Sequence, residues 1–241
     1  MTDRNFNSAK GGTSRVFVIG DIHGAYRALR QCLERSAFDY ENDRLICLGD
    51  VCDGWPETRA SVDELMRIKK LIYLLGNHDW WALQWMLSGK VEPAWYAQGG
   101  KATVDSYQGG VPTGHLAFLS SAVNHYVYEN KLFVHAGIDP LKPLDQQDRN
   151  IFLWDRTLAT AALRLYGSSA EGKLSSYDEV YLGHTPIPFS TPINSNGIWL
   201  MDTGAGWSGP LSMMNVETKE MFISDPVPSL YPGIEGRKRK I

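Results

Sequence analysis

Short apolar runs recur along the chain, and each of them stops abruptly at a residue that can bind a metal ion. The runs are four to six residues long, rich in β-branched side chains and bounded by glycine and polar residues, as is typical of buried strands. They cover residues 15–20, 44–49, 71–76, 131–134, 179–183 and 197–201. The residues that directly follow them are Asp21, Asp50, Asn77 with His78, His135, His184 and Asp202.

Amphipathic helical patterns lie between the early runs. They cover residues 25–35 and 57–70, with apolar positions on one face and charges on the other. Alternation of strand and helix favours an α/β fold, in which parallel strands carry helices on the sheet. In such sheets functional groups gather beyond the carboxyl ends of the strands. The polar residues after the runs are therefore expected to share one edge.

The pattern also divides the chain. We expect a flexible N-terminus over residues 1–14, one domain over 15–224 and an extended tail over 225–241. Within the domain, residues 80–129 lose the strand pattern and are rich in tryptophan and paired glycines, which favours a helical insertion or cap beside the site. The basic residues 237–240 are expected to form a solvated terminus.

Composition excludes several classes of protein. The formal net charge is −3 over 241 residues, so we expect no nucleic-acid partner. The three cysteines show no CxxC spacing, which favours a reducing compartment. No apolar run approaches the roughly 18 residues of a membrane span, so we expect a cytoplasmic protein without a membrane partner.

The residue types after the strands suit two divalent metal ions. Asp21 and His23 are two residues apart and can face one ion, and the Asp50 carboxylate can bridge two. Oxygen and imidazole ligands together favour manganese, with iron, zinc or cobalt as alternatives. Six ligands are too many for one tetrahedral ion but suit a pair about 3.5–4 Å apart. The candidate ligands are Asp21, His23, Asp50, Asn77, His135 and His184.

A metal pair of this kind activates a bridging hydroxide for direct attack on phosphorus. The leaving alkoxide then needs a proton. His78, next to Asn77, is placed to donate it, and Asp53 is a candidate to orient that imidazole. The sequence therefore predicts hydrolysis of a phosphate ester without a covalent intermediate.

Five motifs, in this order, carry a family resemblance. They are Gly20-Asp-Ile-His-Gly24, Gly49-Asp-Val-Cys-Asp53, Gly76-Asn-His-Asp79, Val134-His-Ala-Gly137 and Gly183-His-Thr-Pro186. The set resembles the calcineurin-like metallophosphoesterases. Within them it is most similar to the phosphoprotein-phosphatase branch, which includes bacterial and phage Ser/Thr phosphatases and symmetrical diadenosine tetraphosphatases.

The resemblance implies how the residues divide their work. One metal would lie on Asp21, His23 and Asp50, and the second on Asp50, Asn77, His135 and His184. His78 would be the general acid, paired with Asp53, and Arg156 would bind the substrate phosphate. The implied fold is an αββα sandwich, two mixed β-sheets packed face to face with flanking helices.

Two positions depart from the family pattern. Gly54 and Leu75 stand where the phosphoprotein-phosphatase branch and its bacterial members carry phosphate-binding arginines. A bidentate guanidinium contact is not easily replaced, so the phosphate clamp is weakened. The reaction class is unaffected, but the substrate is left open.

Three functions compete. The first is a phosphomonoesterase acting on phosphoserine or phosphothreonine in proteins, or on a small phosphorylated molecule. The second is a dinucleoside polyphosphate hydrolase or phosphodiesterase, suggested by Trp55, Trp80 and Trp81 near the site. The third, a binding module without catalysis, is disfavoured because every candidate ligand is present.

Asp202 is either an outer partner of the ligands or a strand-end cap.

Overall fold

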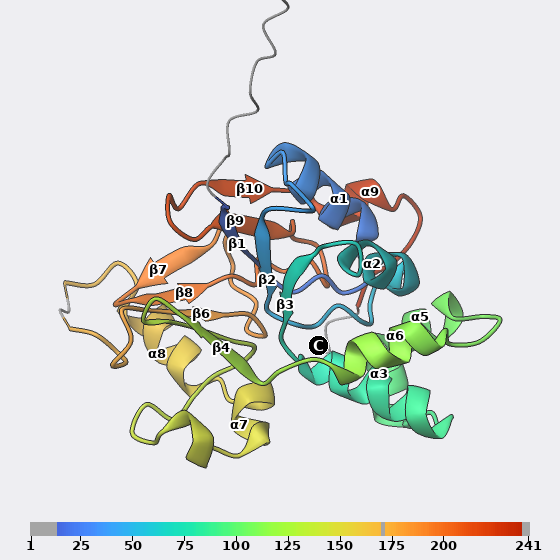
Figure 1. Cartoon of the computed structure of the whole chain (residues 1–241), viewed down its shortest axis with the longest axis horizontal. Helices are drawn as coiled ribbons and strands as arrows, with labels where there is room; N and C mark the ends of the chain where they lie inside the picture. The colour runs from blue at the N-terminus through green and yellow to red at the C-terminus, as the bar shows by residue number, and fades with distance from the viewer. Residues whose placement is uncertain (1–13, 170–171, 238–241) are drawn as a thin grey trace, which may run out of the picture.

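The computed structural model describes residues 14–169 and 172–237, and in these residues ten strands form two five-stranded sheets (Figure 1). The first sheet contains, in order across it, β10 (Met221–Ile223), β9 (Ser212–Asn215), β1 (Val16–Ile19), β2 (Arg44–Cys47) and β3 (Lys70–Tyr73). The second contains β4 (His125–Tyr128), β5 (Lys131–Val134), β6 (Glu179–Leu182), β8 (Ile198–Leu200) and β7 (Ile193–Ser195). Both sheets are mixed.

Helices lie outside the sheets. On the first sheet's side are α1 (Tyr26–Arg35), α2 (Thr58–Leu65) and α9 (Val227–Leu230). A helical group follows β3, made of α3 (Asn77–Ser88), α4 (Pro93–Trp95), η1 (Tyr96–Gly100), α5 (Lys101–Ser106) and α6 (Thr113–Ser120). The second sheet is accompanied by η2 (Leu144–Gln146), α7 (Arg149–Trp154) and α8 (Thr157–Leu165). No helix of the described residues has both the length and the apolar character needed to cross a bilayer.

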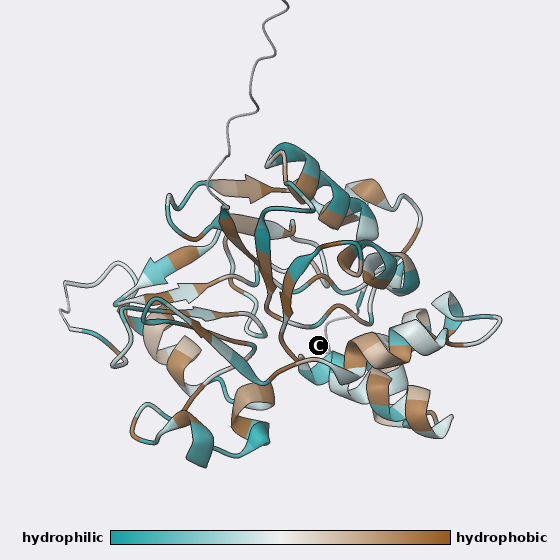
Figure 2. Ribbon diagram, viewed as in Figure 1, coloured by the Kyte–Doolittle hydropathy of each residue, from teal (hydrophilic) through white to brown (hydrophobic). Residues whose placement is uncertain are grey.

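The two sheets pack face to face through a shared apolar layer. Val18 and Ile46 of the first sheet belong to the same buried cluster as Phe133 and Tyr181 of the second. The Phe133 and Tyr181 rings stack with centroids 4.5 Å apart. The hydrophobic strands at the centre of Figure 2 mark this layer. Burial of such surface is the main stabilising contribution to the fold.

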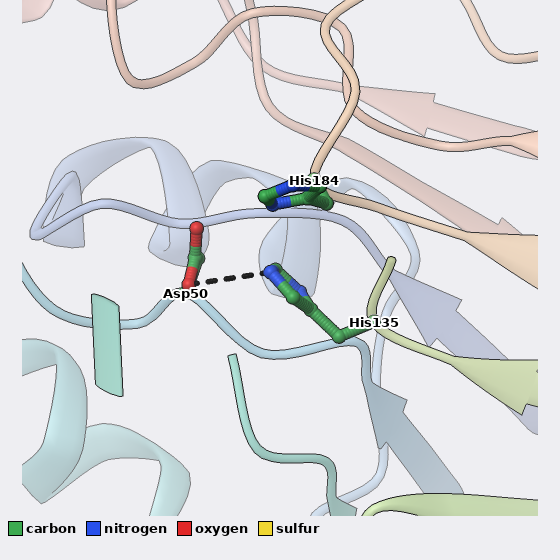
Figure 3. A group of neighbouring side chains, drawn as sticks. All are labelled: Asp50, His135 and His184. Atoms are coloured by element: carbon green, nitrogen blue, oxygen red, sulfur yellow. Dashed lines mark ion pairs between the residues drawn. The ribbon is translucent and has the colours of Figure 1, made fainter. Parts of the chain in front are cut away.

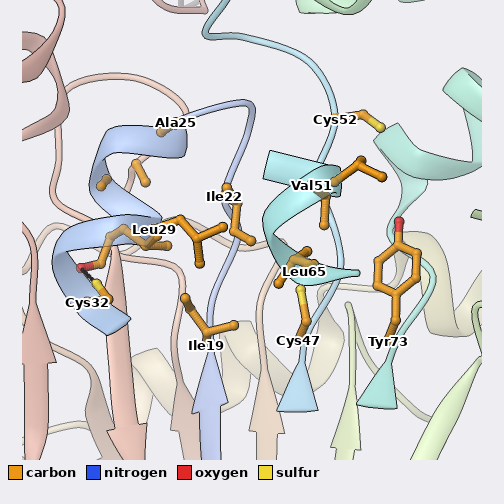
Figure 4. Packing of buried hydrophobic residues seen from close by; sticks show 14 of the residues in the cluster. Ile19, Ile22, Ala25, Leu29, Cys32, Cys47, Val51, Cys52, Leu65 and Tyr73 are labelled. Atoms are coloured by element: carbon orange, nitrogen blue, oxygen red, sulfur yellow. Dashed lines mark hydrogen bonds between the residues drawn. The ribbon is translucent and has the colours of Figure 1, made fainter. Parts of the chain in front are cut away.

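The outer faces are covered by helices. Ile19 and Cys47 of the first sheet pack under Leu29 of α1 and Leu65 of α2 (Figure 4). On the second sheet, a separate cluster joins strand side chains to those of α7 and α8, including Leu132, Leu182, Phe152, Leu158 and Ala162. The expected sandwich of two mixed sheets with flanking helices is therefore confirmed.

Sheet topology explains why the predicted site residues meet. Strands β1, β2 and β3 run parallel, and so do β5, β6 and β8. These are the six apolar runs that the sequence indicates as strands, within one to three residues at their ends. The carboxyl ends of three neighbouring strands in each sheet therefore lie at the same edge of the sandwich.

The structure also corrects the sequence pattern. The helix predicted over residues 57–70 ends at Leu65, because Lys70 already begins β3. Strands β4, β7, β9 and β10 are not indicated by the pattern. β9 has the sequence Ser-Met-Met-Asn, without a β-branched residue, while β7 and β10 contain three residues each, too few to show an alternation.

Candidate metal centre

Asp50 lies at the centre of two overlapping groups of ligand-type side chains. Asp21, His23 and Asp50 form one group, and within it the candidate ligand atoms all lie within 4.8 Å of one another. Asp50, His135 and His184 form the second by the same measure, and Figure 3 shows these three side chains converging. The carboxylate of Asp50 is therefore shared.

The two oxygens of Asp50 face different histidines. Oδ2 lies 3.6 Å from His23 Nε2, and Oδ1 lies 3.5 Å from His135 Nε2. Asn77, the first residue of α3, places its Oδ1 3.0 Å from His135 Nε2. The structure thus brings all six predicted ligands together, and each is at most 5% exposed.

Hydrogen bonds to the main chain orient two of the imidazoles. His23 Nδ1 donates to the Cys52 carbonyl at 3.1 Å, and His135 Nδ1 donates to the Leu48 carbonyl at 2.9 Å. A carbonyl only accepts, so each ring carries its proton on Nδ1 and has its lone pair on Nε2. This is the arrangement of a metal-ligating histidine with an outer partner.

Unsatisfied buried atoms also fit a cation. Among the described residues, His184 Nε2 and Asp202 Oδ2 are buried without a hydrogen-bond partner. Burial raises the pKa of Asp21, and its neighbour Asp202 raises it further. Burial likewise raises the pKa of Asp50. Clustered buried carboxylates with free imidazole lone pairs are costly unless a cation compensates them, so the residues present fit divalent metal ions.

The backbone of the site is held in unusual conformations. Four site residues that are not glycine have positive φ, namely His23 (51°), Asp50 (49°), Asp53 (73°) and His184 (59°). Such conformations are uncommon and cluster at functional sites.

Glycines before the ligands allow the close packing. A Cβ on Gly76 would lie 2.2 Å from the Asp50 amide nitrogen, and one on Gly183 would lie 2.2 Å from Asp21 Oδ1. The recurrent glycine therefore serves close approach between segments, because any side chain there would displace a ligand.

His78 and Asp53 form a buried pair beside the ligands. His78 Nδ1 lies 2.6 Å from Asp53 Oδ2, and the same carboxylate accepts from Trp95 Nε1 and from Thr103 Oγ1, each at 2.7 Å. Burial raises the pKa of Asp53 to about 7 and lowers that of His78 to about 3. With so low a pKa the His78 imidazole is a strong acid once protonated but is mostly neutral near pH 7, and Nε2 is the nitrogen left to face a ligand.

Arg156 lies at the rim of the site. It is exposed at the start of α8, and its Nη1 is 3.5 Å from Thr185 Oγ1 in the turn that carries His184. Its charge adds to burial in lowering the pKa of His184. The arginine is therefore close enough to act electrostatically on the second ligand group.

The tryptophans that lie beside the site are not all those that the sequence suggests. Trp55 is 1% exposed, donates to the Ala205 carbonyl at 2.7 Å and stacks on Tyr231, so it is a core residue. Trp81 contacts the His78 ring edge-on at 5.2 Å and meets Trp154 at 4.9 Å. Trp154, which the sequence does not single out as an aromatic contact, is 38% exposed and lies 6.1 Å from the His184 ring.

Two further side chains complete the surroundings. Asp202 Oδ1 accepts from the Gly204 amide at 2.9 Å, so the residue caps its strand end while Oδ2 remains directed into the buried site. Arg237 donates from Nη1 to His23 Nε2 at 3.1 Å. The expectation of a solvated basic terminus is therefore wrong for Arg237, while residues 238–240 lie outside the described residues.

Comparisons with known proteins agree with this geometry. Residues 14–209 match the sequence model of the calcineurin-like phosphoesterases. The chain is 25% identical over 211 residues to serine/threonine-protein phosphatase 1 of Salmonella typhimurium, covering 84% of this chain and 92% of that protein. It is also 25% identical over 281 residues to the symmetrical bis(5'-nucleosyl)-tetraphosphatase of Pseudomonas fluorescens, covering 90% of this chain and 98% of that protein.

Solved structures share the fold. A metallophosphoesterase from Sphaerobacter thermophilus superposes with a TM-score of 0.55 at 17% identity, covering 87% of each chain. A structure assigned as a candidate diadenosine tetraphosphatase superposes with a TM-score of 0.65 at 21% identity, covering 90% of this chain and 96% of that chain.

Proposed function

Because this chain belongs to the calcineurin-like phosphoesterase family, we propose that it hydrolyses phosphomonoesters at a centre of two divalent metal ions. The observation that carries the proposal is the shared carboxylate of Asp50, whose two oxygens face His23 and His135. A carboxylate placed in this way is suited to bridge two cations. Manganese is the proposed metal, with iron, zinc or cobalt as alternatives for the same donor set.

The proposed ligand sets follow the two groups of side chains. Asp21, His23 and Asp50 would hold one ion, and Asp50, Asn77, His135 and His184 the other. When bound, such a pair of ions supplies an activated water and neutralises charge on the phosphoryl oxygens. The protein's part is to keep the ligands buried and to orient His23 and His135 through main-chain carbonyls.

His78 is the proposed proton donor to the leaving oxygen. Asp53 fixes its orientation, and Trp95 and Thr103 in turn hold Asp53. Since Nδ1 is engaged by Asp53, Nε2 is the atom from which the proton would be delivered. Arg156 would attract the substrate phosphate at the rim.

The proposed substrates are phosphoserine or phosphothreonine in proteins, or a small phosphorylated molecule. The Salmonella relative, named as a serine/threonine phosphatase and similar over most of both chains, supports this class. The exposed side chain of Arg156 at the start of α8 is also compatible with a bulky substrate.

A second candidate is hydrolysis of dinucleoside polyphosphates. The observation in its favour is the pair Trp81 and Trp154, which forms an aromatic wall beside His78 and His184. A partly exposed indole next to the leaving-group side offers a surface on which a nucleobase can stack. The Pseudomonas relative is named for this activity.

The cytoplasm is the proposed location. Cys32, Cys47 and Cys52 are all buried and unpaired. Free thiols without a disulfide partner are typical of proteins in a reducing compartment.

A substrate panel tests the function. Aryl phosphate, phosphopeptides, nucleotides, dinucleoside polyphosphates and phosphodiesters would be assayed with manganese and with EDTA, using Asp50→Asn as the background control. We expect manganese-dependent release of phosphate from monoesters that EDTA and Asp50→Asn both abolish. Faster turnover of dinucleoside polyphosphates would favour the second candidate, and no turnover above the Asp50→Asn background would leave a binding module.

A further inference from the structure

The C-terminal tail places a cationic side chain over the metal-ligand groups. Arg237 comes after α9, more than 200 positions along the chain from His23, yet its Nη1 donates to His23 Nε2 at 3.1 Å. The side chain is partly buried, and its guanidinium lies over the Trp207 ring, 4.4 Å from the centroid. The tail thus reaches the ligand of one metal group directly.

Several contacts hold the tail in this position. The Tyr231 ring stacks on Trp55 at 5.2 Å, and its hydroxyl donates to Glu57. The Arg237 amide donates to the Gly206 carbonyl at 3.1 Å. A Cβ on Gly236 would lie 2.6 Å from the Trp55 ring, so only glycine permits this approach. The position of Arg237 is therefore fixed by the packing of Tyr231 and Gly236 and by the hydrogen bond of its own amide.

The space that Arg237 occupies is left free by two glycines. A Cβ on Gly54 would lie 3.2 Å from Arg237 Cγ, and a Cβ on Gly99 would lie 3.1 Å from it. Gly54, which directly follows the second motif, is one of the two positions at which an expected phosphate-binding arginine is absent. The Arg237 side chain, which comes from the distant tail, therefore passes over the backbone of Gly54, where no local arginine is present.

The guanidinium has donors to spare. Among the described residues no carboxylate forms an ion pair with Arg237, and its side chain makes one hydrogen bond, to His23. Burial lowers its pKa, while the nearby charges of Asp50, Asp53 and Asp202 act in the opposite direction. An arginine remains charged under these conditions and can present two parallel donors to a phosphate.

Open space also borders Arg237 on the outer side of the tail. Cavities of about 510 and 520 Å³ lie against it on the side of Gly99 and on the side of Trp207, respectively, and none of the proposed metal ligands lines either of them. His23 Nε2 is a proposed metal ligand, so its lone pair cannot serve both an ion and a guanidinium. When an ion binds there, Arg237 needs another acceptor, and the oxygens of a phosphoryl group are acceptors of the matching geometry.

We propose that Arg237 binds the substrate's phosphoryl group, so that the C-terminal tail of this chain completes the phosphate site. The proposal rests on the proposed function, since it assigns a substrate contact to the same centre. It accounts for the absent arginine at Gly54 by a residue from the far end of the sequence.

Direct binding of inorganic phosphate tests the proposal. Phosphate would be titrated into manganese-loaded protein by isothermal calorimetry, for the wild type, Arg237→Ala, Arg237→Lys and the exposed control Arg164→Ala on α8. We expect Arg237→Ala to bind phosphate about 10–100-fold more weakly than the wild type. Arg237→Lys should weaken phosphate binding by a smaller factor, and Arg164→Ala should bind phosphate as tightly as the wild type. Unchanged affinity in Arg237→Ala, or no phosphate binding by the wild type, would overturn the proposal.

Metal titration separates this role from a role in the metal centre. Manganese would be titrated into metal-free protein, with Arg237→Ala expected to bind it at least as tightly as the wild type, because a competitor for His23 has been removed. Weaker manganese binding in the variant would instead make Arg237 a support of the ligands and contradict the proposal. Higher turnover with unchanged phosphate affinity would make the tail an inhibitory plug and contradict it equally.

A shortened chain guards against local misfolding. A protein ending at Gly236 should reproduce the phosphate-binding loss of Arg237→Ala, with a thermal midpoint close to that of the wild type. If the wild type binds phosphate through Arg237 but hydrolyses no member of the substrate panel, the proposed function fails while the phosphate site remains.

Discussion

The buried ligand groups and the exposed rim of the site are built in opposite ways. The candidate ligands lie shortly after the ends of parallel strands and are at most 5% exposed, and hydrogen bonds to main-chain carbonyls orient the imidazoles of His23 and His135. The rim is assembled from the start of α8, from tryptophans of α3 and α7, and from the C-terminal tail. Its members are partly exposed and come from segments far apart in sequence.

This difference indicates which part of the molecule sets the reaction and which part sets the choice of substrate. The reaction depends on groups that sheet topology brings together, so it follows from the fold. Substrate choice depends on side chains that reach the edge from loops, helices and the tail, which can vary without disturbing the sheets. Substitutions in the two regions should therefore differ in both kind and size.

His78→Ala should have the largest effect on the chemical step. It removes the proposed proton donor but no proposed ligand, so kcat should fall by about 10²–10⁴ while manganese remains bound. Steady-state kinetics together with metal analysis would measure this. His125→Ala, a histidine on β4 outside the site, is the matched control. Loss of metal from His78→Ala would show that this residue belongs with the ligands.

Gly183→Ala should test how tightly the ligands are packed. The added Cβ would lie 2.2 Å from Asp21 Oδ1, so the carboxylate must move. Displacements of about 1 Å in an active site can cost about 10²-fold in rate, and we expect a loss of that order with weaker metal binding. Gly114→Ala on α6 is the control, because its Cβ would meet only Met66 at 3.5 Å. Equal behaviour of the two variants would disprove the close packing.

Arg156→Ala should have the smallest effect of the three and a different character. The side chain is exposed, so we expect KM and the inhibition constant for phosphate to rise about 10-fold, with little change in kcat. Arg164→Ala, on the same helix, controls for the loss of one charge. A fall in kcat at constant KM would move Arg156 from the rim to the chemical machinery.

The convergence of the six candidate ligands could be predicted from the sequence because its signal is local. Each ligand follows a buried run, and a preceding glycine such as Gly76 or Gly183 marks the close approach. Parallel strand order then suffices to bring the ends to one edge. The edge strands are harder to predict, since β9 lacks β-branched residues and β7 and β10 are very short.

Arg156 and Trp81 are expected near the site from the sequence, but the position of Arg237 could not be predicted because its contacts are not local. Nothing around Arg237 distinguishes it from its basic neighbours in the sequence. Its position depends on the stacking of Tyr231 on Trp55 and on the contact of Gly236 with that indole, which exist only once the chain has folded. Trp55 misleads for a similar reason, since its place in the core depends on a residue about 180 positions away.

The shared carboxylate of Asp50 has a thermodynamic consequence for the occupancy of the centre. The carboxylate lies between His23 and His135, so a cation at one of its oxygens changes the charge and position of the other oxygen, which faces the second side. Binding at the two positions is then coupled, and the coupling must be equal in both directions. The affinity of each position for its ion is a property of the pair, and so is any preference for one metal over another.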